Sequence, residues 1–323
     1  MEIPIQNIYY MLCYAWNKLE EGKHVRLETD DRPELVNLFA KVLINGINYL
    51  RKQGLDRGYV DYAEDTSTIR GKINFNETIK QNLLVKAKAY CEFDRLSYNV
   101  LHNRLLKSSI SYLVKVDELD NDFKYQLSNI LCWFDDVDYI PPTRTNFHRV
   151  QLNRNNTFYG FLLNVCELIV ENLLVSERKG NTYFRDFRRN SGEMRVLFEH
   201  FVRNFYDLEQ SKYSVDDRWI KWKGHALDSK SADCLGQMHT DITLSSDDRN
   251  IIIDTKFTPR TLASGFRTEK DRIHTGHLYQ IFTYIVNADF PTEKKCEGIL
   301  LYPTIDKHID LKYELCGHPV RVC

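Results

Sequence analysis

Neither sign of charge dominates this sequence of 323 residues, because 44 Lys and Arg residues stand against 45 Asp and Glu residues. The whole chain therefore lacks a basic field that would attract a polyanion, and any such binding must rest on local patches or on a partner. With only 14 Gly and 8 Pro, the sequence is neither collagen-like nor of low complexity. A hydrophobic content of 43% also excludes a wholly disordered chain.

Long hydrophobic runs are missing as well. The longest apolar stretch, residues 161–175, contains Asn164, Glu167, Glu171 and Asn172, so we expect no membrane-spanning segment. The N-terminus has no basic region of the kind that opens a signal peptide. These absences predict a cytoplasmic protein that does not contact a membrane.

Several common kinds of site are absent too. The eight cysteines form no CxxC pair, whereas a structural zinc site normally needs two close pairs of ligands. Cys132 and Cys166 stand in apolar runs, which is typical of small buried hydrophobic residues in a reducing compartment. The sequence has no GxxxxGK[ST], GxGxxG, HExxH or GxSxG motif, so the chain is not itself a P-loop NTPase.

Length and hydrophobic pattern predict two domains. The first, residues 1–176, is mainly helical, because apolar residues recur at helical spacing from 8 to 50 and from 100 to 174. A strand-rich insert at about 58–93 interrupts it with short alternating or β-branched runs, and a short helix is expected at 76–81.

The second domain, residues 177–323, follows a polar segment at 177–181 and is expected to be an α/β domain. Its predicted elements have the order helix, three strands, helix and strand, an αβββαβ core. They lie at 192–208, near 219–222, at 237–244, 251–257, 277–286 and 298–302.

Three charged side chains are predicted to meet at the ends of two of these strands. A short polar turn joins the strands that carry Asp241 and Asp254, so the strands should pair as an antiparallel hairpin with the two aspartates close together. Lys256 is two residues from Asp254 and points to the same face. Carboxylates bind Mg²⁺ for phosphodiester hydrolysis, and a lysine orients water and offsets negative charge. The alternative is a surface salt bridge at a strand end.

Other residues extend this candidate site. Glu199 lies at the edge of the apolar stripe of helix 192–208, either as a further carboxylate of the site or as a solvated glutamate. Gln280 and Tyr284 lie four residues apart on one face of the next helix, where they are placed to meet the site or DNA. Local positive charge for phosphates, or an ordinary solvated surface, comes from Arg185, Arg188, Arg189, Arg195, Arg203, Arg267, Lys270 and Arg272.

With these residues in place, the sequence resembles the McrC family, the nuclease subunits of the modification-dependent McrBC restriction systems. The resemblance covers most of the chain and depends on the order of several short motifs. They are IPIQNIYYMLCYAW at 3–16, RGKI at 70–73, LHNRLLK at 101–107, TDI at 240–242, IDTKF at 253–257, LYQ at 278–280 with Tyr284, and GILLYP at 298–303.

The resemblance implies a PD-(D/E)XK nuclease fold for the second domain. It implies that Asp241, Asp254 and the main-chain carbonyl of Thr255 hold Mg²⁺, and that Lys256 is the catalytic lysine. It implies also that the first domain docks on McrB, an AAA+ ring that hydrolyses GTP, translocates double-stranded DNA and reads 5-methylcytosine. GTP would then be bound by the partner, whose GTPase the McrC family stimulates. Thr240 stands before the first aspartate, where the family pattern has proline.

The expected function is therefore a Mg²⁺-dependent DNA endonuclease subunit of a GTP-driven restriction complex. Within it, the insert at about 58–93 is the candidate contact with the ring, because exposed hairpins of mixed charge suit a reversible interface. Two alternatives stay open. One is a non-catalytic adaptor that keeps the fold and stimulates the GTPase, and the other is a self-sufficient nuclease of another defence system.

Overall fold

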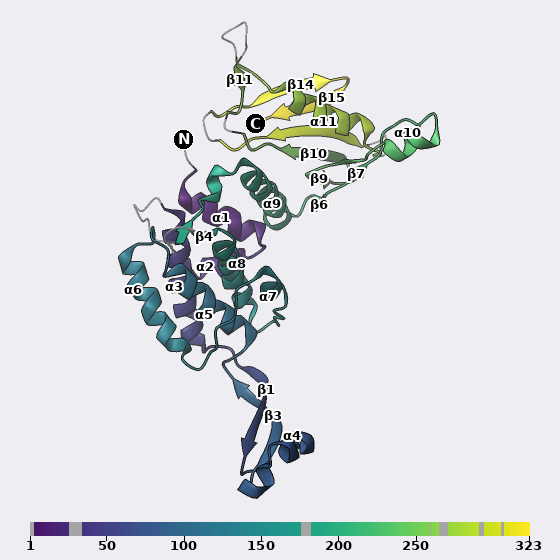
Figure 1. Ribbon diagram of the computed structural model, residues 1–323. Coiled ribbons are helices and arrows are strands. Elements are labelled where there is room, and N and C mark those ends of the chain that lie inside the picture. The colour runs from purple at the N-terminus through teal and green to yellow at the C-terminus, as the bar shows by residue number, and fades with distance from the viewer. Residues whose placement is uncertain are drawn as a thin grey trace. The chain divides into compact units, whose positions relative to one another are not determined.

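The computed structural model describes residues 3–25, 34–175, 182–258, 260–264, 271–290, 294–304 and 307–323. The chain divides into two compact units, which we call the sheet unit (Met1–Leu19 with Phe187–Cys323) and the helical unit (Glu20–Asp186). Both contain helices and strands (Figure 1). No helix within the described ranges is long and apolar enough to cross a bilayer.

This division differs from the expected one at both ends of the first domain. The expected boundary after residue 176 falls at 176–181, outside the described residues, and the observed division lies between Asp186 and Phe187. The N-terminal helix α1 (Ile5–Ala15) belongs to the sheet unit, because it packs along α9 (Ser191–Glu209). The prediction grouped residues 1–176 because they are adjacent in sequence. Helix α1, however, packs against α9, which is distant in sequence.

Aromatic rings and hydrogen bonds hold α1 on α9. The ring centroid of Tyr14 lies 5.5 Å from that of Phe201 and 5.6 Å from that of Phe205. The Tyr14 hydroxyl donates a hydrogen bond to Glu209 Oε1 at 2.7 Å. Asn204 Nδ2 donates to the main-chain oxygen of Tyr14 at 2.8 Å. Tyr14, which is only partly buried, therefore joins α1 to α9 through both its ring and its hydroxyl.

The helical unit is built on four long helices that the apolar pattern predicts. They are α3 (Leu35–Gln53), α5 (Leu101–Leu113), α6 (Asn121–Leu131) and α8 (Thr157–Glu171). Their core includes the fully buried Phe39, Leu105, Leu106, Ile110, Leu127 and Phe161. The shorter elements are α2 (Leu19–Lys23), η2 (Cys132–Phe134), α7 (Arg144–His148), β4 (Leu173–Val175) and β5 (Thr182–Phe184).

The strand-rich insert follows α3 and leaves the helical unit as a small sheet of its own. Strand β1 (Gly58–Thr66) pairs antiparallel with β3 (Ala89–Ser97), and β2 (Lys72–Ile73) joins the other edge of β3. Helix α4 (Phe75–Lys80) and η1 (Leu83–Lys86) lie between β2 and β3 in the chain. The strands and short helix predicted at about 58–93 are confirmed. Before β2, Gly71 has a φ of +58°, and a Cβ there would collide with the main-chain oxygen of Glu92.

A mixed six-stranded sheet, in the order β14-β15-β13-β10-β9-β6, forms the centre of the sheet unit. Its strands are β6 (Ser214–Asp216), β9 (Ile242–Ser245), β10 (Arg249–Thr255), β13 (Lys295–Leu301), β14 (Leu311–Leu315) and β15 (His318–Val322). Strand β10 is antiparallel to β9 and parallel to β13. Helix α11 (Thr275–Asn287) covers one face, where Ile281 and Ile285 share a core with Ile252 and Leu300. The expected α/β character of this part is confirmed.

The strand order departs from the predicted αβββαβ core in three places. The strand expected near 219–222, β7 (Trp219–Ile220), pairs with β8 (Met238–His239) as a separate ribbon, and β6 takes the place beside β9. The strand expected at 237–244 is two strands, because the chain breaks between β8 and β9. The hairpin β14–β15 extends the sheet beyond the predicted core. Its sequence shows no clear hydrophobic pattern, because most of β14 is exposed. The remaining short elements are η3 (Phe187–Arg189), α10 (Ser229–Cys234), β11 (Ala263–Ser264) and β12 (Asp271–Arg272).

Candidate active site

The pairing of β9 with β10 brings Asp241 and Asp254 opposite each other. Ile242 pairs with Ile253, so the next position along the hairpin joins Asp241, just before β9, to Asp254 in β10. Asp254 is fully buried. The predicted closeness of the two aspartates is confirmed, since the antiparallel register sets it.

Thr255 fixes the carboxylate of Asp241. The main-chain N–H of Thr255 donates a hydrogen bond to Asp241 Oδ2 at 2.7 Å, and its hydroxyl donates to the same oxygen at 2.8 Å. Two bonds to one carboxylate oxygen restrain the rotation of the side chain. The sequence singled out only the carbonyl of Thr255, and the structure adds its amide and hydroxyl as the groups that orient Asp241.

Lys256 lies beside Asp254, as predicted. Its Nζ is 2.6 Å from Asp254 Oδ2 and donates a hydrogen bond to Gln280 Oε1 at 2.9 Å. Gln280 Nε2 in turn donates to the hydroxyl of Tyr284 at 2.7 Å, so α11 holds the ammonium through two successive bonds. Only 13% of the Lys256 side chain is exposed and none of Asp254, which excludes the alternative of a solvated surface salt bridge.

Two residues that the sequence did not assign to the site lie near its charged groups, Lys256 and Asp254. His277 Nδ1 lies 2.6 Å from the hydroxyl of Tyr302. Burial, followed by the charge of Lys256, lowers the pKa of His277 to about 4. Burial and then the charge of Asp254 raise the pKa of Tyr302. Both side chains are therefore uncharged at neutral pH. The sequence has no spacing signal for this pair, because their contact depends on how the start of α11 packs beside the end of β13.

Glu199 approaches the two aspartates from α9. It is half-buried, and burial followed by the charge of Asp241 raises its pKa. Burial is also the main cause that raises the pKa of Asp254 to about 7, against the opposing charge of Lys256, while Asp241 and Glu199 raise it further. These mutual effects place Glu199, Asp241 and Asp254 within electrostatic reach of one another, and we call them the carboxylate cluster.

The carboxylate cluster suits a divalent cation. Asp254 Oδ1 is buried and makes no hydrogen bond with any residue that the structure describes. A cation would satisfy this oxygen and offset the repulsion among the three charges. Among the described residues, no three His, Cys, Asp or Glu side chains already converge as ligands on one point. Mg²⁺ does not require such a group, because one or two carboxylates and several waters commonly hold it.

The raised pKa of Asp254 predicts a pH-dependent affinity for Mg²⁺. Below about pH 7 a proton occupies this carboxyl group, and the cation must displace it. We expect the dissociation constant of Mg²⁺, measured by calorimetry, to fall roughly tenfold per pH unit up to that point and then to level off. Glu199→Gln should move the levelling point to lower pH, and Glu314→Gln, on the distant strand β14, should not. A Mg²⁺ affinity that is constant from pH 5 to pH 7 would contradict a metal site at Asp254.

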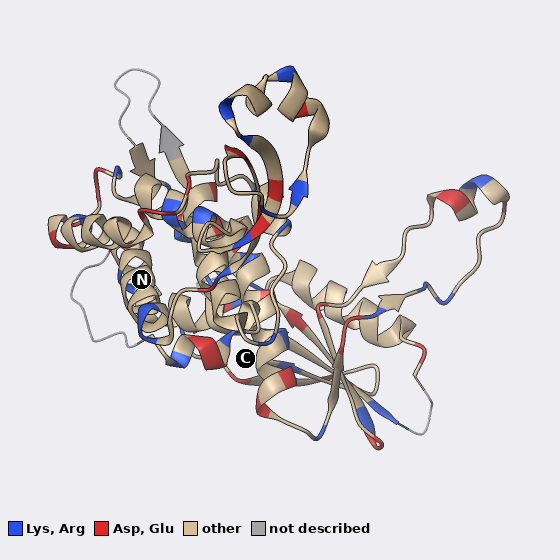
Figure 2. Cartoon of the chain, turned by 90° about the horizontal axis from the view of Figure 1, so that it is seen from below, with Lys and Arg blue, Asp and Glu red and all other residues tan. Residues whose placement is uncertain are grey.

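Several of the predicted basic residues bind other side chains of the protein or lie outside the described residues. Arg267 and Lys270 lie outside the described residues. Arg203 of α9 donates to Asp217 Oδ2 at 2.8 Å, and Arg185 of the helical unit donates to Asn172. Basic and acidic positions are interspersed along the ribbons of both units (Figure 2).

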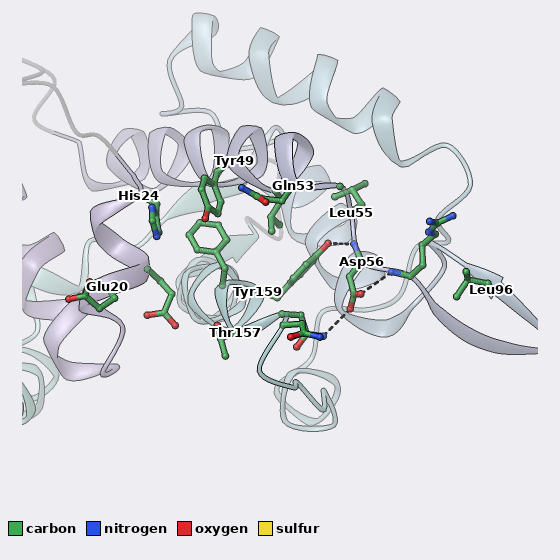
Figure 3. A pocket seen from close by; sticks show the side chains of 16 residues that line it. Glu20, His24, Tyr49, Gln53, Leu55, Asp56, Leu96, Thr157 and Tyr159 are labelled. Atoms are coloured by element: carbon green, nitrogen blue, oxygen red, sulfur yellow. Dashed lines mark hydrogen bonds between the residues drawn. The ribbon is translucent and has the colours of Figure 1, made fainter.

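The helical unit has a pocket of its own at the base of the insert (Figure 3), with a volume of about 800 Å³. Asp56, which precedes β1, accepts a hydrogen bond from Asn156 Nδ2 at 2.9 Å and lies 3.0 Å from His102 Nε2. Its main-chain N–H donates to the hydroxyl of Tyr159 at 2.9 Å. These contacts tie the start of β1 to α5 and α8. The LHNRLLK motif, which contains His102, therefore helps to anchor the insert.

Comparisons with known proteins agree with these observations. A family model described as the McrBC 5-methylcytosine restriction system component matches residues 5–303. The chain belongs to this McrBC family. A relative from Escherichia coli (strain K12), the type IV methyl-directed restriction enzyme EcoKMcrBC, is 30% identical over 321 residues, which are 99% of this chain and 92% of the relative. The predicted resemblance to the McrBC systems is confirmed.

A solved structure shows that the McrBC fold extends over the whole chain. It is a refined half-complex from a tetradecameric assembly of Thermococcus gammatolerans McrB AAA+ hexamers with bound McrC. The match has a TM-score of 0.63 and 16% sequence identity, and it covers 99% of this chain and 70% of that chain. Both the helical unit and the sheet unit therefore have counterparts in that fold.

Proposed function

We propose that this McrBC family member is an endonuclease subunit that hydrolyses phosphodiester bonds of DNA with Mg²⁺. The observation that carries the proposal is the meeting of Asp241, Asp254 and Lys256 at the end of β10, with Lys256 held by Gln280. Helices α9 and α11 both pack on the sheet that contains β9, β10 and β13. This arrangement fits the layout of a PD-(D/E)XK nuclease.

Each residue of the site has a distinct role in this proposal. Asp241, Asp254 and the main-chain carbonyl of Thr255 hold Mg²⁺, and Glu199 adds negative charge beside them. When bound, Mg²⁺ stabilises charge on the attacked phosphate and lowers the pKa of the attacking water. Lys256 orients that water and offsets the negative charge that develops on the phosphate. Its bonds to Gln280 and Asp254 fix the ammonium before the substrate arrives.

We further propose that the chain acts with a McrB-like AAA+ GTPase ring and stimulates its GTP hydrolysis. The Thermococcus structure contains McrB AAA+ hexamers with bound McrC, and the E. coli relative is described as a methyl-directed restriction enzyme. The ring binds GTP in this proposal, because the present sequence has no P-loop motif. A net charge of −1 favours delivery of the nuclease to methylated double-stranded DNA by its partner.

Dependence on the partner tests this function. The chain with Mg²⁺ alone is expected to bind methylated duplex DNA weakly and to cut it at least about 100-fold more slowly than the complex with ring and GTP, because it lacks a basic field. Cleavage of methylated and unmethylated duplexes on gels measures the difference. Tight, methylation-selective binding by the chain alone would favour a self-sufficient nuclease. Stimulated GTP hydrolysis with no cleavage at all would favour an adaptor.

A further inference from the structure

The ribbon β7–β8 starts directly beside the carboxylate cluster. Strand β8 ends at His239, two residues before Asp241. The main-chain N–H of Thr240 donates to the oxygen of Arg218 at 3.0 Å, and the N–H of Arg218 donates to Thr240 Oγ1 at 2.9 Å. Beyond the ribbon, the chain runs out to α10 and returns (Figure 1). The two bonds therefore fix the base of the ribbon next to the site.

The two faces of the ribbon have opposite environments. Ile220 is buried in the core beneath α11, and its cross-strand partner Met238 packs against the same core. Because side chains alternate along a strand, Trp219 and its partner His239 face outward. Their ring centroids lie 4.5 Å apart, and 68% of Trp219 is exposed. The core thus uses the isoleucine and leaves the larger tryptophan in solvent, where folding does not require it.

A cation continues the outward face. Lys221 lies directly after β7, next to the outward face, and is exposed. Residues 218–225 contain three Lys or Arg residues and no Asp or Glu, although the whole chain has a net charge of −1. Over residues 218–237, the arm that carries α10, four Lys or Arg residues stand against two Asp residues, and both signs are visible in Figure 2. The local charge therefore complements a polyanion.

Charged contacts connect this face to the carboxylate cluster. Asp217 Oδ2 accepts a hydrogen bond from Arg203 at 2.8 Å and lies 3.6 Å from His239 Nε2. The charges of Arg203 and His239 both act on Glu199, where they oppose the effects of burial and of Asp241 on its pKa. The ring of Trp219 lies against that same histidine, with the two ring planes tilted by 40°. The outward face is therefore continuous with the surroundings of Glu199.

We propose that Trp219 and His239, on the outward face of the ribbon, bind duplex DNA beside the scissile phosphate together with the adjoining Lys221. This inference rests on the proposed nuclease function, because it assigns the contact that flanks the cleaved bond. Lysine neutralises backbone phosphates, and an exposed aromatic ring stacks on bases or sugars. Continuity with the carboxylate cluster favours DNA over a protein partner, since a protein on this face would stand in the path of the substrate.

The test compares two double variants of the full chain. Trp219→Ala with Lys221→Ala removes the outward face. Lys312→Ala with Tyr313→Ala is the matched control, because it removes an exposed lysine and an exposed tyrosine from β14 at the other edge of the sheet. Binding to a fluorescein-labelled duplex is measured over a range of salt concentrations, with Ca²⁺ in place of Mg²⁺. We expect the ribbon variant to bind roughly 10- to 100-fold more weakly, and the control to bind like the wild type.

Single substitutions separate contact from folding. Lys221→Ala should lower the slope of log affinity against log salt concentration by about 1, and Trp219→Ala should leave the slope unchanged. Trp219→Phe should keep most of the affinity, because its ring still stacks. Thermal melting of each variant checks the fold. If Trp219→Phe binds as weakly as Trp219→Ala, or if the slope is the same in all variants, the proposal is overturned.

Cleavage by the complex with its ring distinguishes this inference from the proposed function. If Asp254→Ala is inactive while the ribbon double variant binds and cuts like the wild type, the nuclease assignment stands and the ribbon assignment is wrong. If Asp254→Ala cuts normally, the nuclease assignment itself fails. Lost stimulation of the GTPase with unchanged DNA affinity would assign the face to a protein and would also overturn the inference.

Discussion

Asp254→Ala is expected to lower DNA cleavage by the reconstituted complex by at least about four orders of magnitude, because it removes the buried carboxylate of the proposed metal site. GTP hydrolysis by the partner should stay at the wild-type rate, since the proposed contact with the ring, the insert at about 58–93, does not contain this residue. Both activities are measured side by side in one preparation. Cleavage at the wild-type rate would show that the hairpin carboxylates are not the active site, and loss of both activities would show that Asp254 is needed for assembly.

The same variant should not lose stability in the absence of a divalent cation. Burial raises the pKa of Asp254 from 3.8 to about 7 in the folded protein. The stability associated with the protonated carboxyl is therefore complete below about pH 4 and is lost as the pH rises through 7. At pH 8 the wild type holds a buried charge that alanine lacks. We expect the melting temperature of the variant to equal or exceed that of the wild type at pH 8, and the difference to shrink toward pH 4.

Lys256→Ala separates charge stabilisation from metal binding. Cleavage should again fall by several orders of magnitude, because no ammonium offsets the charge that develops on the phosphate. The affinity for Mg²⁺ should change by less than about tenfold, since the carboxylate cluster is intact. Lys295→Ala, at the exposed start of β13, is the matched control and should be neutral. If the Lys256→Ala variant cuts DNA like the wild type, Lys256 has no role in cleavage.

Shortening the insert is expected to abolish stimulation of the partner GTPase. Large apolar side chains are exposed along the insert, and they are Tyr59, Ile69, Phe75, Ile79, Leu84 and Val85. A cluster of exposed apolar residues is typical of a surface that a partner covers. Because Thr66 and Ala89 form the last pair of β1 and β3, replacing residues 67–88 by Asn-Gly leaves a closed hairpin. We expect GTP turnover to fall at least about 100-fold, to the rate of the ring alone.

Two smaller changes control this experiment. Leu84→Ser with Val85→Ser keeps every element of the insert and should still weaken stimulation, because it removes only exposed apolar surface. Tyr125→Ser removes an equally exposed residue from α6 and should have no effect. If the shortened chain stimulates GTP hydrolysis like the wild type, the ring contact lies elsewhere in the protein.

The sequence predicted those parts of the fold that are encoded locally. Helices α3, α5, α6 and α8 have apolar stripes that periodicity detects. The aspartate pair was also accessible, because a short turn between two apolar strands leaves little choice of register. For Glu199 the sequence left two interpretations open, a carboxylate of the site or a solvated glutamate, because its burial depends on where α9 packs.

Features set by contacts between distant segments could not be predicted in the same way. Trp219–Ile220 has the composition of a strand, but only the competition between β6 and β7 for the edge of β9 decides which of them joins the sheet. His277 and Tyr302 meet because the start of α11 lies beside the end of β13, 25 residues later in the chain. Neither residue has a spacing that reveals the other.

The place of α1 in the sheet unit has a consequence for the order in which the parts of the protein fold during synthesis. Because α1 precedes α9 in the chain, its apolar face leaves the ribosome well before α9 has been synthesised to cover it. The helical unit, which lies between them in sequence, is complete when Asp186 emerges and can form its core first. Until α9 emerges, Tyr14 lacks the rings of Phe201 and Phe205 against which it packs, and it is exposed to solvent or to a chaperone.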